Sequence, residues 1–233
     1  GRSFAEANKG YAPSAYGIFT SVGGGLNEVD HNVFAIRNEG APNHCERGSG
    51  AYALFIGGSD QGGVYHHNTI VCNDTPVWIA TTYGPAANTT LHDNRFVCTP
   101  AADGRDYAPV WLGWWKYQPE NVAFYSNAFE GIPFRVKIND YAKHEAGYTV
   151  GWTLTVKAAA GTAVEVRRAG EAATVAAGTT DREGLWSARL AEYREQGSGR
   201  GGQLTHTDLS HYTVQANGKA TDVVMDRDRQ VEL

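Results

Sequence analysis

A short pattern of polar and apolar positions recurs four times in the first half of the chain. Each copy places an asparagine two positions before a large apolar side chain, as in EVDHNVFAI, VYHHNTIVC, TLHDNRFVC and AFYSNAFEG. The asparagines lie 26 to 36 residues apart, and they are Asn32, Asn68, Asn94 and Asn127. A constant internal pattern at a spacing of this size is typical of a repeat architecture, in which each copy forms one structural unit.

A second row of strand-like segments precedes the asparagines. These segments are rich in aromatic and β-branched residues, and they read YGIFTSV (16–22), ALFIGGS (53–59), VWIATTY (77–83) and VWLGWWK (110–116). The distance to the following asparagine is nearly constant, whereas the segment after each apolar run varies in length. We therefore predict coils of strand, turn, strand, asparagine turn, strand and variable loop. The residues of the first strand expected in the core are Ile18, Phe55, Ile79 and Leu112.

This pattern resembles the right-handed parallel β-helix of the pectate-lyase type, over about residues 11 to 135. In that family an asparagine recurs at the tight turn between the second and third strands of each coil. Asparagine tolerates the left-handed backbone conformation, and its amide can bond to the same amide one coil away. The resemblance implies a structural ladder formed by Asn32, Asn68, Asn94 and Asn127.

From about residue 136 the repeat gives way to short strands of alternating apolar and polar residues. This half resembles the β-sandwich of carboxypeptidase-regulatory and transthyretin-like domains. The resemblance is carried by Gly161, Val164, Val166, Thr179-Thr180-Asp181, Gly184, Val231 and Leu233. We predict an all-β protein, with a short right-handed parallel β-helix of about four coils (1–135) followed by a small antiparallel β-sandwich (136–233).

Composition and charge narrow the possible partners. The formal net charge of −5 is mild and argues against a nucleic-acid partner. No apolar run is long enough for a membrane span, and no motif calls for a cofactor. There are three cysteines, none in C-x-x-C spacing. Cys72 and Cys98 hold the same position in adjacent copies, so we expect stacked core thiols, and a disulfide between them stays open.

Histidines cluster next to the asparagine turns. His66 and His67 precede Asn68, and His31 and His92 occupy similar places in the neighbouring copies. We predict solvent-facing turn residues and no metal site, because no matching carboxylate cluster is evident. A site built from His31, His67 and their neighbours is the alternative. A second trio, formed by His206, Asp208 and His211, is predicted to be a polar loop and strand start.

Aromatic residues gather on the first-strand row. Many parallel β-helix proteins bind or cleave acidic polysaccharides along one outer face, and the resemblance implies the same bias here. Rings that point outward could stack on sugars. The candidates for substrate binding are Trp78, Trp111, Trp114 and Trp115. The alternative is that the loops at 37–50 and 99–109 fold over these rings and bury them.

Catalytic signatures are sparse. The first-strand row holds no Asp or Glu, although calcium-dependent lyases need several oxygen ligands and inverting glycosidases need two carboxylates. Whether the chain is an enzyme therefore stays open. If it is a polysaccharide lyase or hydrolase, the candidate catalytic residues are Lys116, Tyr117, Tyr83, Asp60 and Arg47.

Two functions follow as expectations. The first is an extracellular or cell-surface protein that binds or processes polysaccharide through its aromatic outer face. The second is a structural subunit that assembles with copies of itself, head to tail, through the open end of the β-helix. The polar opening segment GRSFAEANKGYA makes an unconvincing cap for that end, and an uncovered first coil would offer unpaired backbone groups to another chain.

Overall fold

The computed structural model contains β-strands and no helix among the residues that it describes. These are residues 15–20, 26–38, 50–58, 60–80, 84–102, 104–114, 117–139, 145–197 and 204–233. The chain forms two compact units. The first comprises Gly1–Val122, Asn127–Tyr148 and Gln196–Thr205, and the second comprises Ala123–Ser126, Thr149–Glu195 and His206–Leu233. The all-β prediction is confirmed: parallel coils are followed by an antiparallel sheet.

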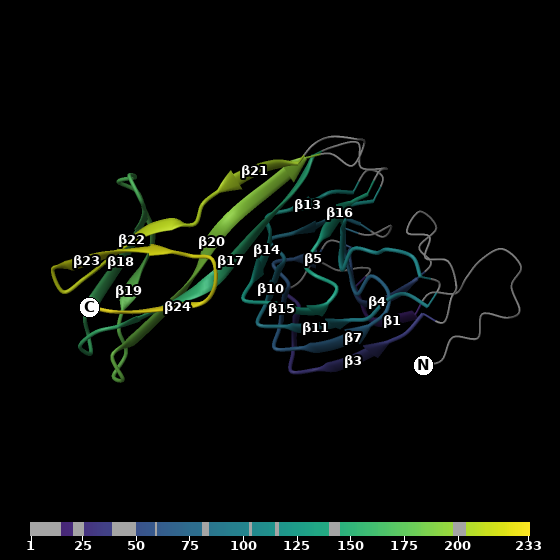
Figure 1. The fold of residues 1–233 in the computed structure, drawn as a ribbon, viewed down its shortest axis with the longest axis horizontal. Coiled ribbons are helices and arrows are strands. Elements are labelled where there is room, and N and C mark those ends of the chain that lie inside the picture. Colours follow the sequence, from purple (N-terminus) through teal and green to yellow (C-terminus); the bar gives the residue numbers. More distant parts are fainter. Residues whose placement is uncertain are drawn as a thin grey trace, which may run out of the picture. The chain divides into compact units, whose positions relative to one another are not determined.

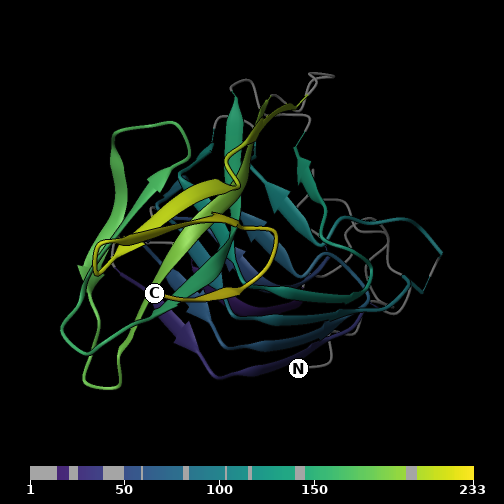
Figure 2. The same ribbon diagram turned by 60° about the vertical axis from the view of Figure 1, so that its left-hand side comes forward.

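The first unit is a stack of parallel sheets to which each coil adds one strand (Figures 1 and 2). One sheet has the order β1 (Ala15–Thr20), β4 (Ala51–Ile56), β8 (Val77–Ile79), β12 (Val110–Leu112) and β16 (Val136–Ile138). A second contains β2 (Glu28–Asp30), β6 (Val64–His66) and β10 (Thr90–His92). A third contains β3 (Val33–Ile36), β7 (Thr69–Cys72), β11 (Arg95–Cys98) and β15 (Ala128–Gly131). Short strands β5 (Asp60–Gln61), β9 (Ala86–Ala87) and β13 (Pro119–Glu120) form the last.

The large apolar residue after each asparagine points into the coil. Ile70 and Phe96 are fully buried, and they are register partners in β7 and β11. The rings of Phe96 and Phe129 stack at 4.5 Å between centroids. Burial of a side chain of this size stabilises the fold by about 1.5–3 kcal/mol, so this row accounts for the constancy of the pattern.

The register of the first-strand row differs from the sequence alignment. Ile18 pairs with Leu54, and Phe55 pairs with Trp78. The row that contains Ile79 and Leu112 is completed by Thr20, Ile56 and Ile138. Placing Ile18 and Phe55 in that row was wrong, because turns of slightly different length separate the strand from its asparagine. Ile18 is displaced by two positions and stays on the face of Ile79, whereas Phe55 is displaced by one position, which moves its side chain to the opposite face.

The asparagine ladder is present. The backbone N–H and the Nδ2 of Asn32 donate to Oδ1 of Asn68 at 3.0 and 3.1 Å. Asn68 donates in the same way to Asn94 at 3.0 Å, and Asn94 donates to Asn127 at 3.0 and 2.9 Å. The left-handed residue is the one before each asparagine, with φ between 51° and 53° at His31, His67, Asp93 and Ser126. The amide ladder therefore stabilises the turn by hydrogen bonding, while the preceding residue adopts the unusual backbone.

The two ends of the coil stack differ. At the first coil, Leu26 and Val33 are 84% and 77% exposed, and β1, β2 and β3 are edge strands of their sheets. At the last coil, the ring of Phe134 packs against Phe129 at 5.0 Å and against Tyr148 at 6.0 Å. Residues of the first unit itself therefore cover the core at the last coil.

The second unit contains two sets of strands around one core. One set has the order β14 (Val122–Tyr125), β17 (Ala146–Lys157), β20 (Leu185–Gly197) and β21 (Thr205–Asp208), and β24 (Arg229–Glu232) pairs with β17. The antiparallel set is β19 (Thr174–Thr179), β18 (Ala163–Arg168), β22 (His211–Ala216) and β23 (Lys219–Val224). Both sets contribute to a core of Leu154, Val156, Val164, Val166, Leu190, Tyr212 and Val214.

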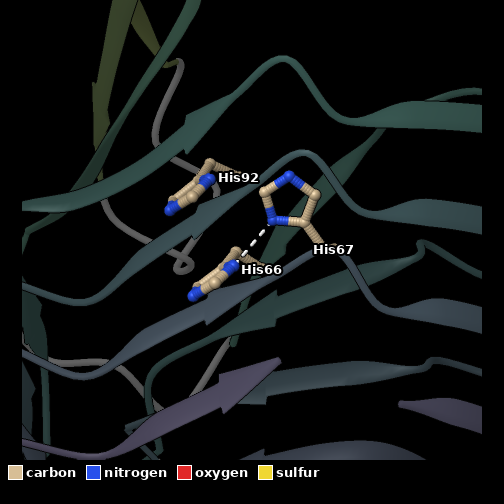
Figure 3. A group of neighbouring side chains, drawn as sticks. All are labelled: His66, His67 and His92. Atoms are coloured by element: carbon tan, nitrogen blue, oxygen red, sulfur yellow. Dashed lines mark hydrogen bonds between the residues drawn. The ribbon is translucent and has the colours of Figure 1, made fainter. Parts of the chain in front are cut away.

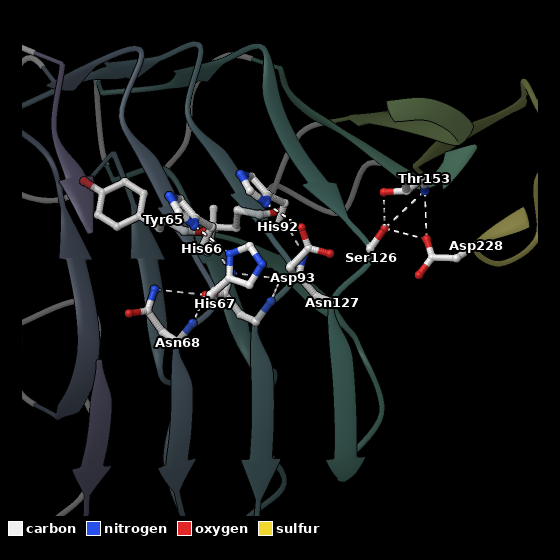
Figure 4. A network of polar contacts seen from close by, with 12 residues as sticks. Tyr65, His66, His67, Asn68, His92, Asp93, Ser126, Asn127, Thr153 and Asp228 are labelled. Atoms are coloured by element: carbon white, nitrogen blue, oxygen red, sulfur yellow. Dashed lines mark hydrogen bonds and ion pairs between the residues drawn. The ribbon is translucent and has the colours of Figure 1, made fainter. Parts of the chain in front are cut away.

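A polar contact also joins segments of this unit that are distant in sequence. Oδ1 of Asp228 accepts hydrogen bonds from Oγ of Ser126 at 2.6 Å and from the backbone N–H of Thr153 at 2.8 Å (Figure 4).

Candidate metal centre

Three histidines converge at the C-terminal ends of β6 and β10, in the second parallel sheet. His66 ends β6 and His92 ends β10, and the two residues are register partners. Their rings stack with centroids 4.7 Å apart and planes 2° apart. The ring of His67 stands nearly perpendicular to the ring of His66 (Figure 3). One nitrogen from each of the three rings lies within 4.8 Å of the others.

The turn geometry brings His66 and His67 together although they are adjacent in sequence. Successive side chains of a strand point to opposite faces. His67 escapes this alternation because its φ is 53°, which is the left-handed turn conformation repeated in every coil. Nδ1 of His66 and Nδ1 of His67 are consequently only 2.7 Å apart. The asparagine ladder holds the turn itself in place through the hydrogen bond from Asn68 to Asn94.

Carboxylates accompany the imidazoles. Oδ2 of Asp93 lies 2.7 Å from Nδ1 of His92, and Oε1 of Glu28 lies 3.1 Å from Nε2 of His66. One coil earlier, Asp30 pairs with His31 at 2.8 Å. This hydrogen bond is the main cause that lowers the pKa of Asp30 below its usual value. The ring of His31 stacks on the ring of His67 at 5.0 Å, so the stacked imidazoles extend to the first coil.

Burial differs within the group. The side chains of His66 and His92 are 14% and 6% exposed, whereas His67 is exposed. The prediction that all of these residues are solvent-facing turn residues was therefore wrong for His92. Carboxylates, which the sequence interpretation found missing, are present as Asp93 and Glu28. The alternative, a site built from His31, His67 and their neighbours, shares His67 with this group, and His66 and His92 lie beside it.

A sequence signal for this group was available. His66 and His92 both stand two positions before a ladder asparagine, and this places them on the same face of adjacent coils. Aligning the copies on their asparagines therefore predicts that His66 and His92 are neighbours. What it lacked was the rotation of His67, because the left-handed conformation at the residue before the asparagine could not be read from the pattern.

The second histidine trio does not form a site among the described residues. His206 pairs with Glu195 at 3.3 Å between Nδ1 and Oε1. Asp208 instead accepts hydrogen bonds from the backbone N–H and the hydroxyl of Ser210, which lower its pKa. The expectation of a polar loop and strand start agrees with these contacts.

The rings expected to stack on sugars are buried in part. Trp78 is fully buried and Trp111 is 7% exposed, and they form a cluster with Tyr52 and Phe55. Ala108, from the segment 99–109, and Trp114 pack against this cluster. The prediction that Trp78 and Trp111 form an open platform was therefore wrong, and the burial alternative describes these two rings. Trp115 lies outside the described residues.

The catalytic candidates do not assemble into a described site. Lys116, Tyr83 and Arg47 lie outside the described residues. Tyr117 forms an antiparallel bridge with Trp114. Asp60 is buried, and its carboxylate accepts hydrogen bonds from Nδ2 of Asn27 at 2.7 Å and from the hydroxyl of Tyr65 at 3.0 Å. These contacts give Asp60 a structural role within the coil.

Replacing Asp60 with asparagine is expected to change how stability depends on pH. Burial raises the pKa of Asp60, although the hydrogen bonds from Asn27 and Tyr65 oppose this shift. Because the pKa is higher in the folded state, protonated Asp60 contributes its whole stabilising effect only below the unfolded pKa of about 4. This effect is lost as the pH rises from there through the folded pKa. We expect Asp60→Asn to be more stable relative to the parent protein at pH 7 than at pH 4, as measured by urea denaturation. An equal difference at both pH values would contradict this.

The two cysteines of the repeat are buried, unbonded thiols. Cys72 and Cys98 are register partners, and their sulfur atoms lie 3.5 Å apart. The hydrogen bond between them lowers the pKa of Cys98 and, together with burial, raises the pKa of Cys72. The prediction of stacked core thiols is confirmed.

Comparisons of the whole chain with protein-family models, with curated proteins and with solved structures found no match. In the part of the chain that the structure describes, no helix is long and apolar enough to cross a bilayer. The histidine group is thus interpreted from its own geometry.

Proposed function

We propose that the first unit binds a divalent transition-metal ion through His66, His67 and His92. The observation that carries this proposal is the convergence of three imidazole nitrogens within 4.8 Å. Small adjustments of three side chains around one point are sufficient to direct their lone pairs at a common ion. The carboxylate of Asp93 contacts Nδ1 of His92 at 2.7 Å and so helps to fix the orientation of that ring.

The chemistry of the donors selects the class of ion. Imidazole nitrogen suits Zn²⁺, Cu²⁺ and Ni²⁺, whereas Mg²⁺ and Ca²⁺ prefer oxygen ligands. Three protein ligands leave room for water or a further ligand on a tetrahedral ion. The stacked coils supply a rigid frame, because the two stacked rings sit on strands that are paired in register.

Replacing His66 with alanine is expected to abolish tight binding of Zn²⁺. His66 touches both other members of the group, through the Nδ1 contact with His67 and the ring stack with His92. Loss of a residue that only supports a metal ligand typically weakens binding about 10–100-fold. His66 is a proposed ligand itself, so we expect a larger loss of affinity. Isothermal titration with Zn²⁺ measures this directly, and binding also raises the melting temperature by mass action.

His211→Ala provides the matched control, because His211 is exposed and lies in the second unit. It should bind Zn²⁺ as the parent protein does. The proposal is refuted if the parent protein shows no saturable binding of Zn²⁺, Cu²⁺ or Ni²⁺. It is refuted equally if His66→Ala retains the parent affinity.

We also propose the finer assignments of fold that the sequence suggests. The right-handed, pectate-lyase type of coil is supported by the asparagine ladder at the same turn of every coil. The transthyretin-like assignment is supported by the antiparallel order β19-β18-β22-β23. An extracellular or cell-surface location and binding of polysaccharide stay predictions. Polysaccharide binding now lacks support from Trp78 and Trp111, because both are buried.

Self-association through the first coil is a second candidate function. Among the described residues no donor reaches Oδ1 of Asn32, which is the first asparagine of the described ladder. Val33 beside it is 77% exposed. Head-to-tail growth would require the last coil to receive a copy, and Phe134 packs over Phe129 there. Because Phe134 covers the last coil, metal binding is the better supported of the two functions. Light scattering of the parent protein and of Val33→Lys tests the candidate. Particles larger than a monomer that Val33→Lys dissociates would support it, and a monomeric parent protein would exclude it.

A further inference from the structure

We infer that Glu28 selects Nδ1 of His66 as the metal-binding atom and so acts as a positioning residue for the site. This inference rests on the proposed metal site and adds a residue from the first coil to it. The observation is the approach of Oε1 of Glu28 to Nε2 of His66 at 3.1 Å.

The chemistry of the two groups determines the tautomer. An ionised carboxylate only accepts hydrogen bonds, and a neutral imidazole has one N–H and one lone pair. The contact with Glu28 therefore places the proton of His66 on Nε2. The lone pair is then on Nδ1, which is the atom that faces Nδ1 of His67 at 2.7 Å. A carboxylate that accepts from the other nitrogen of a metal-binding imidazole is a recurrent arrangement, because it fixes the ring and raises the basicity of the ligand.

The contact of Asp30 with His31 and the longer side chain of Glu28 explain why Glu28 takes this role instead of Asp30. In the pairing of β2 with β6, Asp30 lies opposite His66 and Glu28 lies opposite Val64. Asp30 is engaged by its neighbour His31 at 2.8 Å. The longer side chain of Glu28 reaches diagonally along the strands to His66, so the two acids of β2 serve different imidazoles.

The proton on His67 follows from the same assignment. Because Nδ1 of His66 accepts, Nδ1 of His67 donates in the short contact between them. When an ion binds at both Nδ1 atoms, the proton of His67 moves to its Nε2 by exchange with solvent, to which this residue is exposed. His67 thus stays neutral, and its proton changes nitrogen without net gain or loss.

The test compares Glu28→Gln with Glu130→Gln. Glutamine at position 28 can donate to Nε2, which removes the preference for the Nε2–H tautomer. Glu130 is an exposed acid of the same unit that pairs with Arg95, remote in sequence from the histidines, and it serves as the control. Two readouts are needed: the Zn²⁺ affinity, and the tautomer of His66 in the metal-free protein from long-range ¹H–¹⁵N NMR.

We expect the parent protein and Glu130→Gln to show His66 protonated at Nε2, and Glu28→Gln to lose this preference and to bind Zn²⁺ 10–100-fold more weakly. A weaker affinity with an unchanged tautomer would overturn the inference, because loss of charge alone would then explain the effect. An unchanged affinity would overturn it as well. If the parent protein binds no metal at all, the proposed function fails, and the NMR result alone still shows whether Glu28 sets the tautomer.

Discussion

Replacing Asn94 with alanine is expected to lower the free energy of unfolding by about 3–5 kcal/mol, since each buried polar group left without a partner costs about 1–3 kcal/mol. Asn94 is 2% exposed and occupies the centre of the ladder. Its Oδ1 accepts from the N–H and Nδ2 of Asn68, and its Nδ2 donates to Oδ1 of Asn127 and to the carbonyl of Tyr65 at 2.8 Å. Urea denaturation followed by circular dichroism measures the change.

Asn121→Ala is the matched control for this variant. Asn121 is exposed and donates to Oδ1 of Asn88 at 3.1 Å, outside the ladder. Because the φ of Asn121 is 52°, alanine there is strained, and we expect a loss of about 1–2 kcal/mol, clearly smaller than at Asn94. Equal effects of the two replacements would mean that the ladder contributes nothing specific to the stability of the coils.

Replacing Asp74 with alanine is expected to destabilise the first unit by about 3–5 kcal/mol, which is typical when one member of a buried ion pair is removed. Asp74 is fully buried, and its partners among the described residues include the four that follow. Its carboxylate accepts from the backbone N–H groups of Thr75 and Ala51 at 2.9 and 3.2 Å and from Nδ2 of Asn38 at 2.8 Å, and it pairs with Arg105 at 3.1 Å. Its loss removes an acceptor from donors of the buried residues Asn38, Ala51 and Thr75 and removes the ion pair with Arg105. Thermal unfolding monitored by tryptophan fluorescence reports the loss.

Asp222→Ala controls for the general effect of removing an acid. Asp222 is exposed on β23 and accepts a hydrogen bond from Thr213 at 2.7 Å. We expect little change in the melting temperature. A similarly small change for Asp74→Ala would show that the buried cluster around Asp74 is compensated by water, against the contacts described above.

The repeat could be predicted from sequence because its causes are local and periodic. An asparagine at each turn and an apolar residue two positions later report on one coil at a time, and every coil repeats the same requirement. Cys72 and Cys98 were placed correctly on this basis, since they share the position four residues after a ladder asparagine. The register of the first strands did not follow from this pattern, because the turns between these strands and the asparagines differ in length, and the alignment misplaced Ile18 and Phe55.

The exposure of the aromatic row could not be predicted in the same way. Alternation along a strand distinguishes two faces, but it does not tell whether another segment covers the outer one. Trp78 lies on the face opposite its buried neighbours Val77 and Ile79, yet all three residues are buried. Ala108 belongs to the loop 99–109, whose path depends on what it packs against, and Trp114 follows β12 and packs on the same cluster.

The sequence by itself determined the parallel coils, the ladder of Asn32, Asn68, Asn94 and Asn127, and the change to antiparallel strands in the second half. These follow from short-range patterns that strand geometry and turn chemistry impose. Only the tertiary structure decided that Trp78 is buried and that His66, His67 and His92 meet. Burial depends on distant segments. The imidazoles meet because the register between coils pairs His66 with His92, and because the left-handed turn at His67 brings its ring next to the ring of His66.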